Sequence, residues 1–592
     1  MNSFIGGRFQ KTSGRLDGLL DYKEGSDSWC HDVGDFTIKA GYERSESSRI
    51  TTWSDGRRAG VVHGVVTNLV ELGWSLEDMF LHLLRDPVTT APNLEGCFVI
   101  ICQDTSKNQQ LIVSDKLGTR AAFYTNSGPF RYASDVDKLL EFLTEQSLDI
   151  QAVSDMLLLG HLWGDRTLVQ EISALRPSSV LEVVNGERSL TRYWKPDYRE
   201  AKLGQEFLGE LVRRYRQAVR RVTRTLPSDA GIWLSGGLDS RTTAAALVQQ
   251  GRTDNFELSA YTYDANPPTN DNPKIAREVA RTLGITHQEV PLTAATVGQN
   301  FERIVNATDG MLMWAVGANL AATYEINNPT PVLMEGMQGA LLGDHLYRHH
   351  LYDFSNVVKS QLSSEAIASP DEAQRFLTES VDPFTTLKSE AERSAESSTR
   401  EKILDVHFQN YYNRLAMPSN RLMRERVGTR VIHADGDYLE WCAKLPRSYR
   451  KGAFRSRWTP DGGIPYEPTR AKLALIRNVD PELAKITYER TKVKPSHPYP
   501  IHVMGFIGNV LVNRLRSNPT YGSSQLADYW IRDSCTAVHD HVTRLVDDAC
   551  SRDIFDSNAV KEVYDAHLEG ENNASILSRI TTLESWIQNH LD

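Results

Sequence analysis

A short loop of small residues has the composition of an anion-binding site, and its one-letter sequence is SGGLDS. Glycines let backbone N–H groups approach an anion closely, and a helix that follows adds the partial positive charge of its N-terminus. The two serine hydroxyls supply further donors, while a carboxylate beside bound phosphates is a typical ligand of Mg²⁺. We therefore predict that ATP and Mg²⁺ bind here, with Asp239 as the metal ligand. The residues expected to contact the nucleotide at this loop are Leu234, Ser235, Gly236, Gly237, Leu238, Asp239 and Ser240.

The sequence around the loop predicts the elements that position it. The apolar run 231–234 is typical of a buried strand, and the run 241–250, which ends at Gly251, is typical of a helix. A β-type run at 257–263 and a helical pattern at 273–284 repeat this alternation, which indicates a parallel sheet covered by helices. No Lys-Ser/Thr pair follows the glycines, as it does in a Walker loop, and this favours cleavage between the α and β phosphates.

The first third of the chain has a different pattern. Short β-rich runs alternate with turns from Thr51 to Leu143, and Phe98–Cys102 and Leu111–Val113 are expected to be strands joined by a polar hairpin. A polar stretch with a proline and no periodicity follows Trp194 and has the character of a linker. Because 592 residues exceed what one hydrophobic core usually serves, we expect two domains, at 1–200 and 206–592.

Composition excludes several classes of protein. With 40% apolar and 24% charged residues, the chain has the balance of a globular protein. The formal charge of -10 comes from dispersed acids without a long basic block, so nucleic acid is not expected as a partner. No apolar run reaches the roughly 18 residues of a membrane span, and a membrane is not expected either. Six cysteines without a CxxC pair, and an N-terminus unlike a signal peptide, predict a cytoplasmic location.

Several segments, together with the SGGLDS loop, resemble the asparagine synthetase-like family of adenylating enzymes. They occur in the order that the family has, and they cover most of the chain. The resemblance implies an α+β layered domain of the N-terminal-nucleophile type, glutaminase-like, followed by an α/β parallel-sheet synthetase domain of the PP-loop (adenine-nucleotide α-hydrolase-like) type. The segments are HGVVTNLVEL, SDKLGTRAAFYT, WGDRTLVQEISALRPSSVLEV, GTRVIHADGDYLEWCAKLP and YERTKVKP.

The resemblance also implies roles for residues outside the loop. Tyr263, at the end of the second predicted strand, would lie near the adenine, and Gly336 would contact the nucleotide. Lys492 matches a lysine that approaches the α-phosphate and stabilises the charge that develops there, so Lys492 and Asp239 are the expected catalytic residues. Arg430 and Asp435 match an arginine and an aspartate of another family segment.

The sequence departs from the family pattern at two places. Glutaminases of this family use a cysteine at the position that Asn2 occupies here, so the resemblance implies that glutamine hydrolysis is absent. The nitrogen would then come from ammonia or from an amine of the substrate. The family's acidic loop has Met337 and Ala340 at the places of an acid and a magnesium-binding aspartate, where Glu335 or Asp344 could compensate.

Three kinds of function remain open at this stage. The first is amide bond formation through an acyl-adenylate, from a small-molecule or peptide carboxylate and an amine, including the ring-closing reactions of β-lactam synthetases and lasso-peptide cyclases. The second is a synthetase that adenylates a carbonyl oxygen of tRNA. The third is a catalytically degenerate scaffold that still binds nucleotide. A homodimer is possible in each case.

Overall fold

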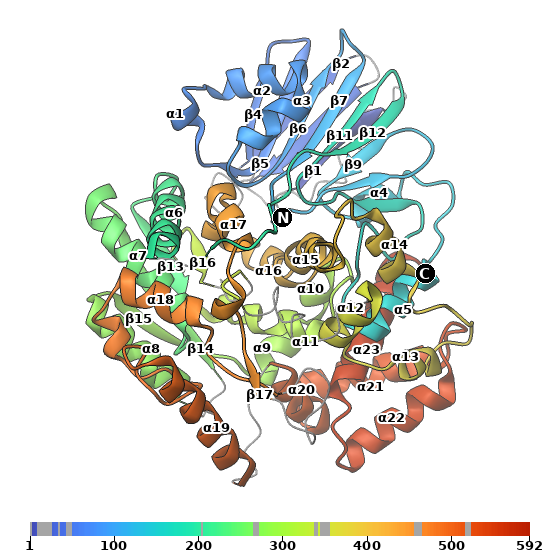
Figure 1. Ribbon diagram of the computed structural model, residues 1–592. Helices are drawn as coiled ribbons and strands as arrows, with labels where there is room; N and C mark the ends of the chain where they lie inside the picture. Colours follow the sequence, from blue (N-terminus) through green and yellow to red (C-terminus); the bar gives the residue numbers. More distant parts are fainter. Residues whose placement is uncertain are drawn as a thin grey trace.

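The N-terminal part of the chain is built on two stacked antiparallel sheets. The computed structural model describes residues 3–8, 27–33, 36–42, 50–202, 205–264, 271–336, 341–343, 356–454, 464–515 and 523–592. Both sheets have six strands, ordered β10-β8-β9-β1-β3-β2 and β12-β11-β7-β6-β5-β4 (Figure 1). The strands of the first sheet are β1 (Ser3–Arg8), β2 (Asp27–Val33), β3 (Phe36–Tyr42), β8 (Phe123–Thr125), β9 (Arg131–Ala133) and β10 (Ile172–Ala174). Those of the second are β4 (Ile50–Ser54), β5 (Arg58–Val66), β6 (Gly96–Asp104), β7 (Gln109–Ser114), β11 (Ser179–Val184) and β12 (Glu187–Arg192).

Strand β6 shows why this part forms layers. Its side chains alternate between two cores, with Val99 and Ile101 packed between the sheets and Phe98 and Ile100 packed under helices. The N-terminus of α2, one of the helices on that outer face, is closed by a capping box between Ser75 and Asp78. The predicted hairpin is therefore confirmed as β6 and β7. The helices of this part are α1 (Leu69–Leu72), α2 (Leu76–Arg85), α3 (Pro87–Thr90), α4 (Asp137–Leu140) and α5 (Ile150–Leu159).

A four-stranded parallel sheet organises the second part of the chain. Its order is β15-β14-β13-β16, and the register pairs Trp233 with both Tyr261 and Glu335, so the carboxyl ends of three strands meet at one edge. Helices α7 and α8 connect the strands and α6 packs against α7, as the alternating pattern predicts. The elements are β13 (Asp229–Trp233), β14 (Glu257–Asp264), β15 (Thr286–Pro291), β16 (Leu333–Glu335), α6 (Gln205–Thr223), α7 (Leu238–Asp254) and α8 (Asn272–Leu283).

Helices make up most of the remainder and join the two parts through a common core. Nearly all of α5 is buried, and it packs on α13 and on α23, which is the last helix of the chain (Figure 1). A short antiparallel pair, β17 (Ala453–Phe454) and β18 (Ile464–Pro465), lies outside the main sheets. The helices are α9 (Ala294–Gln299), α10 (Phe301–Asn306), α11 (Trp314–Gly317), α12 (Val357–Glu365), α13 (Pro370–Arg375), α14 (Thr385–Arg393), α15 (Thr399–Asn410), α16 (Asn420–Arg424), α17 (Gly436–Ala443), α18 (Arg470–Val479), α19 (Tyr499–Leu515), α20 (Ser523–Arg532), α21 (Ala537–Cys550), α22 (Ser557–Glu569) and α23 (Ala574–His590).

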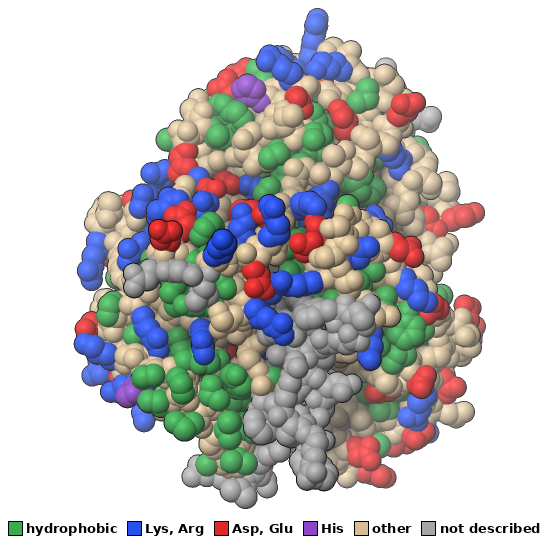
Figure 2. All heavy atoms as spheres, in the orientation of Figure 1, with side chains coloured by type: hydrophobic (Ala, Val, Ile, Leu, Met, Phe, Trp, Pro, Cys, Tyr) green, Lys and Arg blue, Asp and Glu red, His purple; other side chains and the backbone are tan. Residues whose placement is uncertain are grey.

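Helix α19 presents an apolar face to solvent. Met504 is 64% exposed and Leu511 is 55% exposed, and Ile507 and Val512 are exposed as well. Figure 2 shows apolar side chains gathered in the region of α19, at the lower left. No helix in the described part of the chain has the length and apolar character that crossing a membrane requires.

Candidate active site

The SGGLDS loop connects β13 to α7, as predicted, but the helix begins earlier than expected. Its first residue is Leu238, so Asp239 and Ser240 lie in the first helical turn and only three residues remain in the loop itself. Leu238 is buried against Leu473 and Tyr488, and this packing supports the early start. Gly237 is the N-cap residue and has no side chain to occupy the N–H groups of the first turn. This end of a 17-residue helix therefore presents donors and a partial positive charge to an anion.

The two serine hydroxyls of the loop face each other. Their oxygens are 2.8 Å apart, and the Ser240 hydroxyl accepts a hydrogen bond of 3.0 Å from the backbone N–H of Ser235. The Ser235 hydroxyl also accepts from the N–H of Gly237 at 3.2 Å. These bonds hold the loop in an open turn before any ligand enters, so a bound phosphate exchanges bonds with groups that are already positioned.

Two glycines allow close approaches around the loop. The N–H of Gly236 donates to the side chain of Asn272 at 2.7 Å, which ties the loop to the start of α8. Gly336 follows β16 directly, and a Cβ atom added there would lie 2.3 Å from the Cα of Ser240. The structure thus places Gly336 against the loop, next to the residues that sequence assigned to the nucleotide.

Gly336→Ala is expected to displace the loop. Because the backbone of Ser240 cannot move away as a flexible side chain could, we expect a loss of stability of about 1–3 kcal/mol and roughly tenfold weaker ATP binding. The measurement is the ATP dissociation constant by calorimetry, together with the unfolding midpoint. Gly209→Ala on α6 is the control, since a Cβ there meets nothing within 4 Å. Unchanged ATP affinity in Gly336→Ala would contradict the prediction.

Asp239 has a partner that sequence analysis did not find. The Nζ of Lys472 lies 3.3 Å from the Asp239 carboxylate, and the side chain of this lysine is only 8% exposed. Lys472 reaches the loop from the first turn of α18, where its own N–H is held by Thr469. The two positions are far apart in the sequence, so no local signal connects them. The carboxylate thus lies beside a cation, and a bound Mg²⁺ would share it with Lys472.

Arg241 is the second residue that sequence analysis missed. Its side chain is fully buried, and it donates hydrogen bonds to the backbone carbonyls of Gly236, Leu483, Ile486 and Thr487. Burial lowers the pKa of the guanidinium to about 10. Arg241 therefore fastens the loop to the segment that leads to Lys492. The available signal was a charged residue directly after the loop, followed by a run of small and apolar residues from Thr242 to Val248.

Lys492 occupies a tight turn close to the loop. Its backbone has a left-handed φ of 56°, and its N–H donates to the carbonyl of Tyr488 at 2.9 Å. The Nζ pairs with Asp271 at 2.9 Å, and Asp271 precedes the Asn272 that holds Gly236. Gly505 of α19 packs directly on the turn, because a Cβ there would lie 2.4 Å from the Thr491 carbonyl oxygen. The side chain of Lys492 remains 43% exposed and is thus available to a ligand at the loop.

Tyr263 and Glu335 lie at the carboxyl ends of β14 and β16. The Tyr263 ring packs edge-on against Trp233 with centroids 5.1 Å apart, and burial raises the pKa of its hydroxyl. Burial likewise raises the pKa of Glu335 to about 7, although a hydrogen bond with Asn420 opposes the shift. A carboxyl group that titrates near neutral pH at such an edge can act as a general acid or base.

The remaining residues that the sequence assigned to the site do not lie at the loop or are not described by the structure. Arg430 and Asp435 are buried elsewhere, where Arg430 contacts Thr225 and Asp435 pairs with Arg221. Asn2, Met337, Ala340 and Asp344 lie outside the described residues. Within the described ranges, no group of three or more His, Cys, Asp or Glu side chains is arranged to hold a metal ion. Asp239 as a single carboxylate suits Mg²⁺, which typically takes one or two protein carboxylates and completes its shell with water and substrate phosphates.

The sequence matches two family models, one for each of the two parts of the chain. Residues 211–588 match the family model for asparagine synthase, and residues 82–194 match that for a glutamine amidotransferase domain. The chain belongs to the asparagine synthase family. Both the resemblance and the predicted fold class, a layered N-terminal-nucleophile-like domain followed by a parallel-sheet domain, are confirmed.

Three curated relatives show how distant the similarity is. The chain is 26% identical over 240 residues to asparagine synthetase [glutamine-hydrolyzing] 3 of Bacillus subtilis strain 168, covering 37% of this chain and 38% of the relative. It is 27% identical over 267 residues to asparagine synthetase [glutamine-hydrolyzing] 2 of the same organism, covering 40% and 34%. It is 24% identical over 349 residues to the Gallus gallus enzyme asparagine synthetase [glutamine-hydrolyzing], covering 56% and 57%. The matched region thus spans between 34 and 57% of the length of these relatives.

Proposed function

We propose that this protein forms an amide bond between a carboxylate and an amine, driven by ATP through an acyl-adenylate, without hydrolysing glutamine. ATP-dependent amide formation is general for the family. The observation that carries the proposal is the N-terminus of α7, where the Asp239 carboxylate lies 3.3 Å from the Nζ of Lys472 and the N-cap residue Gly237 has no side chain. Lys492 lies in a turn near this loop, where its Nζ pairs with Asp271. One carboxylate and two lysines near a helix N-terminus suit a nucleotide whose pyrophosphate leaves.

The proposed reaction has two steps. The substrate carboxylate attacks the α-phosphorus of ATP, the bond to the β-phosphate oxygen breaks, and pyrophosphate leaves. The amine then attacks the activated carbonyl carbon, loses a proton and displaces AMP. Mg²⁺, when bound, would neutralise charge on the phosphates beside Asp239. Lys472 and Lys492 would stabilise the charge that develops on the phosphate oxygens. Glu335, at the carboxyl end of β16 and with a pKa raised to about 7, would accept the proton of the amine.

We propose that glutamine is not hydrolysed because the usual nucleophilic cysteine is missing and because Cys30, Cys97 and Cys102 do not fit its role. The residue before Ser3 in β1 is Asn2, whose amide side chain is not a nucleophile. Cys97 and Cys102 are buried in β6, and burial raises the pKa of the Cys102 thiol. Cys30 is exposed but lies inside β2, so it has no free α-amine to act as its base. Ammonia or a substrate amine would therefore supply the nitrogen.

The test of this function is a comparison of nitrogen donors. With a suitable carboxylate and Mg-ATP, the protein is expected to release AMP and pyrophosphate with ammonium or an amine and to give no glutamate from glutamine. Products are measured by chromatography, and ATP–pyrophosphate exchange is followed with a panel of carboxylates. Formation of ADP and phosphate would refute the acyl-adenylate, and release of glutamate would refute the loss of glutaminase activity.

A second candidate function is that of a nucleotide-binding scaffold without catalysis. The residues that favour it are Met337 and Ala340, which replace the acidic residues of the family. A scaffold would bind Mg-ATP yet fail to exchange pyrophosphate with every carboxylate. A ring-closing reaction is distinguished from an intermolecular one by the substrate, because it proceeds with AMP release when no external amine is added.

Lys492→Gln is expected to impair chemistry more than folding. Its ion pair with Asp271 is exposed, and such pairs contribute about 1 kcal/mol or less to stability. Losing a charge that stabilises the transition state typically lowers kcat by about 100-fold, with a smaller change in the KM for ATP. Steady-state kinetics give both constants. Lys485→Gln, at an exposed position before the same turn, is the control, and a Lys492→Gln variant with control-like kcat would disprove the role.

A further inference from the structure

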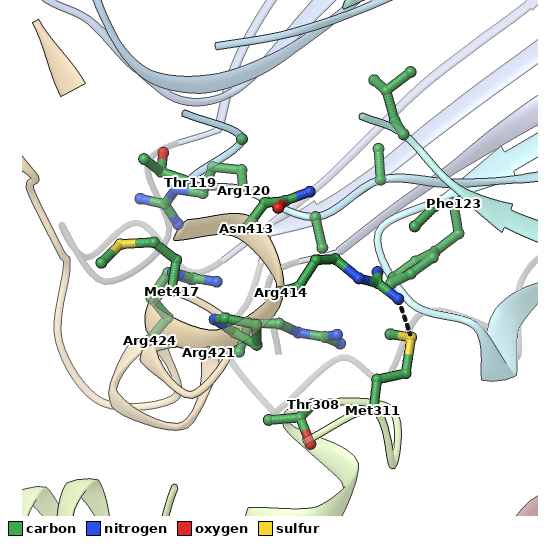
Figure 3. A pocket seen from close by; sticks show the side chains of 16 residues that line it. Thr119, Arg120, Phe123, Thr308, Met311, Asn413, Arg414, Met417, Arg421 and Arg424 are labelled. Carbon is green, nitrogen blue, oxygen red and sulfur yellow. Dashed lines mark hydrogen bonds between the residues drawn. The ribbon is translucent and has the colours of Figure 1, made fainter. Parts of the chain in front are cut away.

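A cavity lies where the N-terminal and C-terminal parts of the chain meet. One wall is the segment after β7, which carries Arg120, and the opposite wall includes the π-helical turn Tyr411–Ala416 and α16. The cavity between them has a volume of about 40 Å³. Figure 3 shows four arginine side chains directed into this region, with Arg120 and Arg424 coming close together beside Met417.

These four arginines differ in how their charges are compensated. Arg421 pairs with both Asp135 and Asp309, and Arg414 donates to the carbonyls of Leu162 and Arg166. Arg120 is only 5% exposed. Its Nη2 donates a long hydrogen bond of 3.4 Å to the carbonyl of Thr429, and its Nη1 atom is buried without a hydrogen-bond acceptor among the described residues. Within the described ranges, no carboxylate forms an ion pair with either Arg120 or Arg424.

The charges of Arg120 and Arg424 are only partly compensated, through attraction to Asp115 and to Asp135 respectively. Burial lowers the pKa of Arg120 to about 10. Burial, together with repulsion from Arg120 and Arg421, lowers the pKa of Arg424 well below its ordinary value. A buried cation that lacks a partner is costly, and an anion placed between the two guanidinium groups would remove much of that cost.

We propose that this cavity is a binding site for a small oxyanion of the phosphate class, held between Arg120 and Arg424, with Arg421 beside it. The planar guanidinium group matches the oxygens of a phosphate with two parallel hydrogen bonds, and Arg120 has a donor available for them. Part of the lining is apolar (Ala121, Ala122 and Phe123), and the volume of about 40 Å³ suits a compact ion rather than a long charged chain. The site is separate from the loop at residues 235–240, so it extends beyond the proposed amide-forming activity.

Inorganic phosphate is the probe, and the full chain is titrated by calorimetry at constant ionic strength, with chloride replacing phosphate in the blank. We expect saturable binding that is at least tenfold weaker in Arg424→Gln, while Arg424→Lys retains an intermediate affinity. Arg424→Gln should also unfold at a higher temperature than the wild type when phosphate is absent, because the repulsion is gone. A merely structural arginine would give the opposite shift. Arg426→Gln is the control, since Arg426 donates to the carbonyls of Thr323 and Ile326.

Phosphate could also bind at the nucleotide loop, and Ser240→Ala separates the two locations. Our proposal expects phosphate binding to survive in Ser240→Ala and to be lost in Arg424→Gln. The reverse pattern, or equal binding in the wild type and Arg424→Gln, overturns it. Pyrophosphate in a second titration shows whether the cavity takes the larger ion. Crystals soaked in selenate should show an anomalous peak between Arg120 and Arg424, and a peak at the loop alone would count against the cavity.

Discussion

Asp239→Asn is expected to lower ATP–pyrophosphate exchange by about 100- to 1000-fold, because it removes the only carboxylate placed at the loop's first helical turn while keeping its shape. The neutral amide is a poor Mg²⁺ ligand and no longer offsets the charge of Lys472 at 3.3 Å. Exchange is measured with radiolabelled pyrophosphate at saturating Mg-ATP. Activity within threefold of the wild type would exclude Asp239 from the reaction.

The ion pair with Lys472 makes a second variant necessary. Asp239→Asn leaves a nearly buried lysine without its carboxylate, so part of any loss could come from lower stability. The double variant Asp239→Asn with Lys472→Met removes both charges and is expected to recover the unfolding temperature but not the exchange activity. If both the unfolding temperature and the exchange activity recovered, Asp239 would serve to neutralise Lys472 and would have no role in binding the nucleotide or its Mg²⁺.

Arg241→Met is expected to have the largest effect on stability. Four backbone carbonyls lose a charged donor in a site from which water is excluded, and breaking such a buried interaction costs about 3–5 kcal/mol. The carbonyl of Gly236 is one of the four, so the loop also loses its tie to the segment before Lys492. We expect a lower denaturation midpoint in urea and at least tenfold weaker ATP binding.

The control for Arg241→Met is another arginine of the same helix. Arg252 is exposed in the last turn of α7, and Arg252→Met should change stability by less than about 0.5 kcal/mol. Arg241→Lys tests geometry rather than charge, because an ammonium group cannot reach four carbonyls that lie in different directions. A denaturation midpoint for Arg241→Lys equal to that of the wild type would show that charge alone is sufficient.

Local patterns were sufficient for the elements that carry the loop. The alternation of strand and helix from 231 onwards predicts β13, α7, β14 and α8, because each of these elements is specified by its own periodicity and by the residues at its ends. The sequence pattern predicts a start for α7 at Arg241, three residues later than its first residue in the structure, Leu238. Small polar residues favour turns locally, but the packing of Leu238 against Leu473 and Tyr488 draws them into the helix.

The family, the order of its two kinds of sheet and the loop expected to hold a pyrophosphate all follow from local sequence patterns. Only the tertiary structure decided that Lys472 faces Asp239, that Gly336 touches Ser240 and that Arg120 meets Arg424 across the two parts of the chain. The physical reason is that these partners lie far apart in the sequence. Their contact depends on how the sheets and helices pack. The sequence around one residue of a pair contains no signal that identifies the other residue.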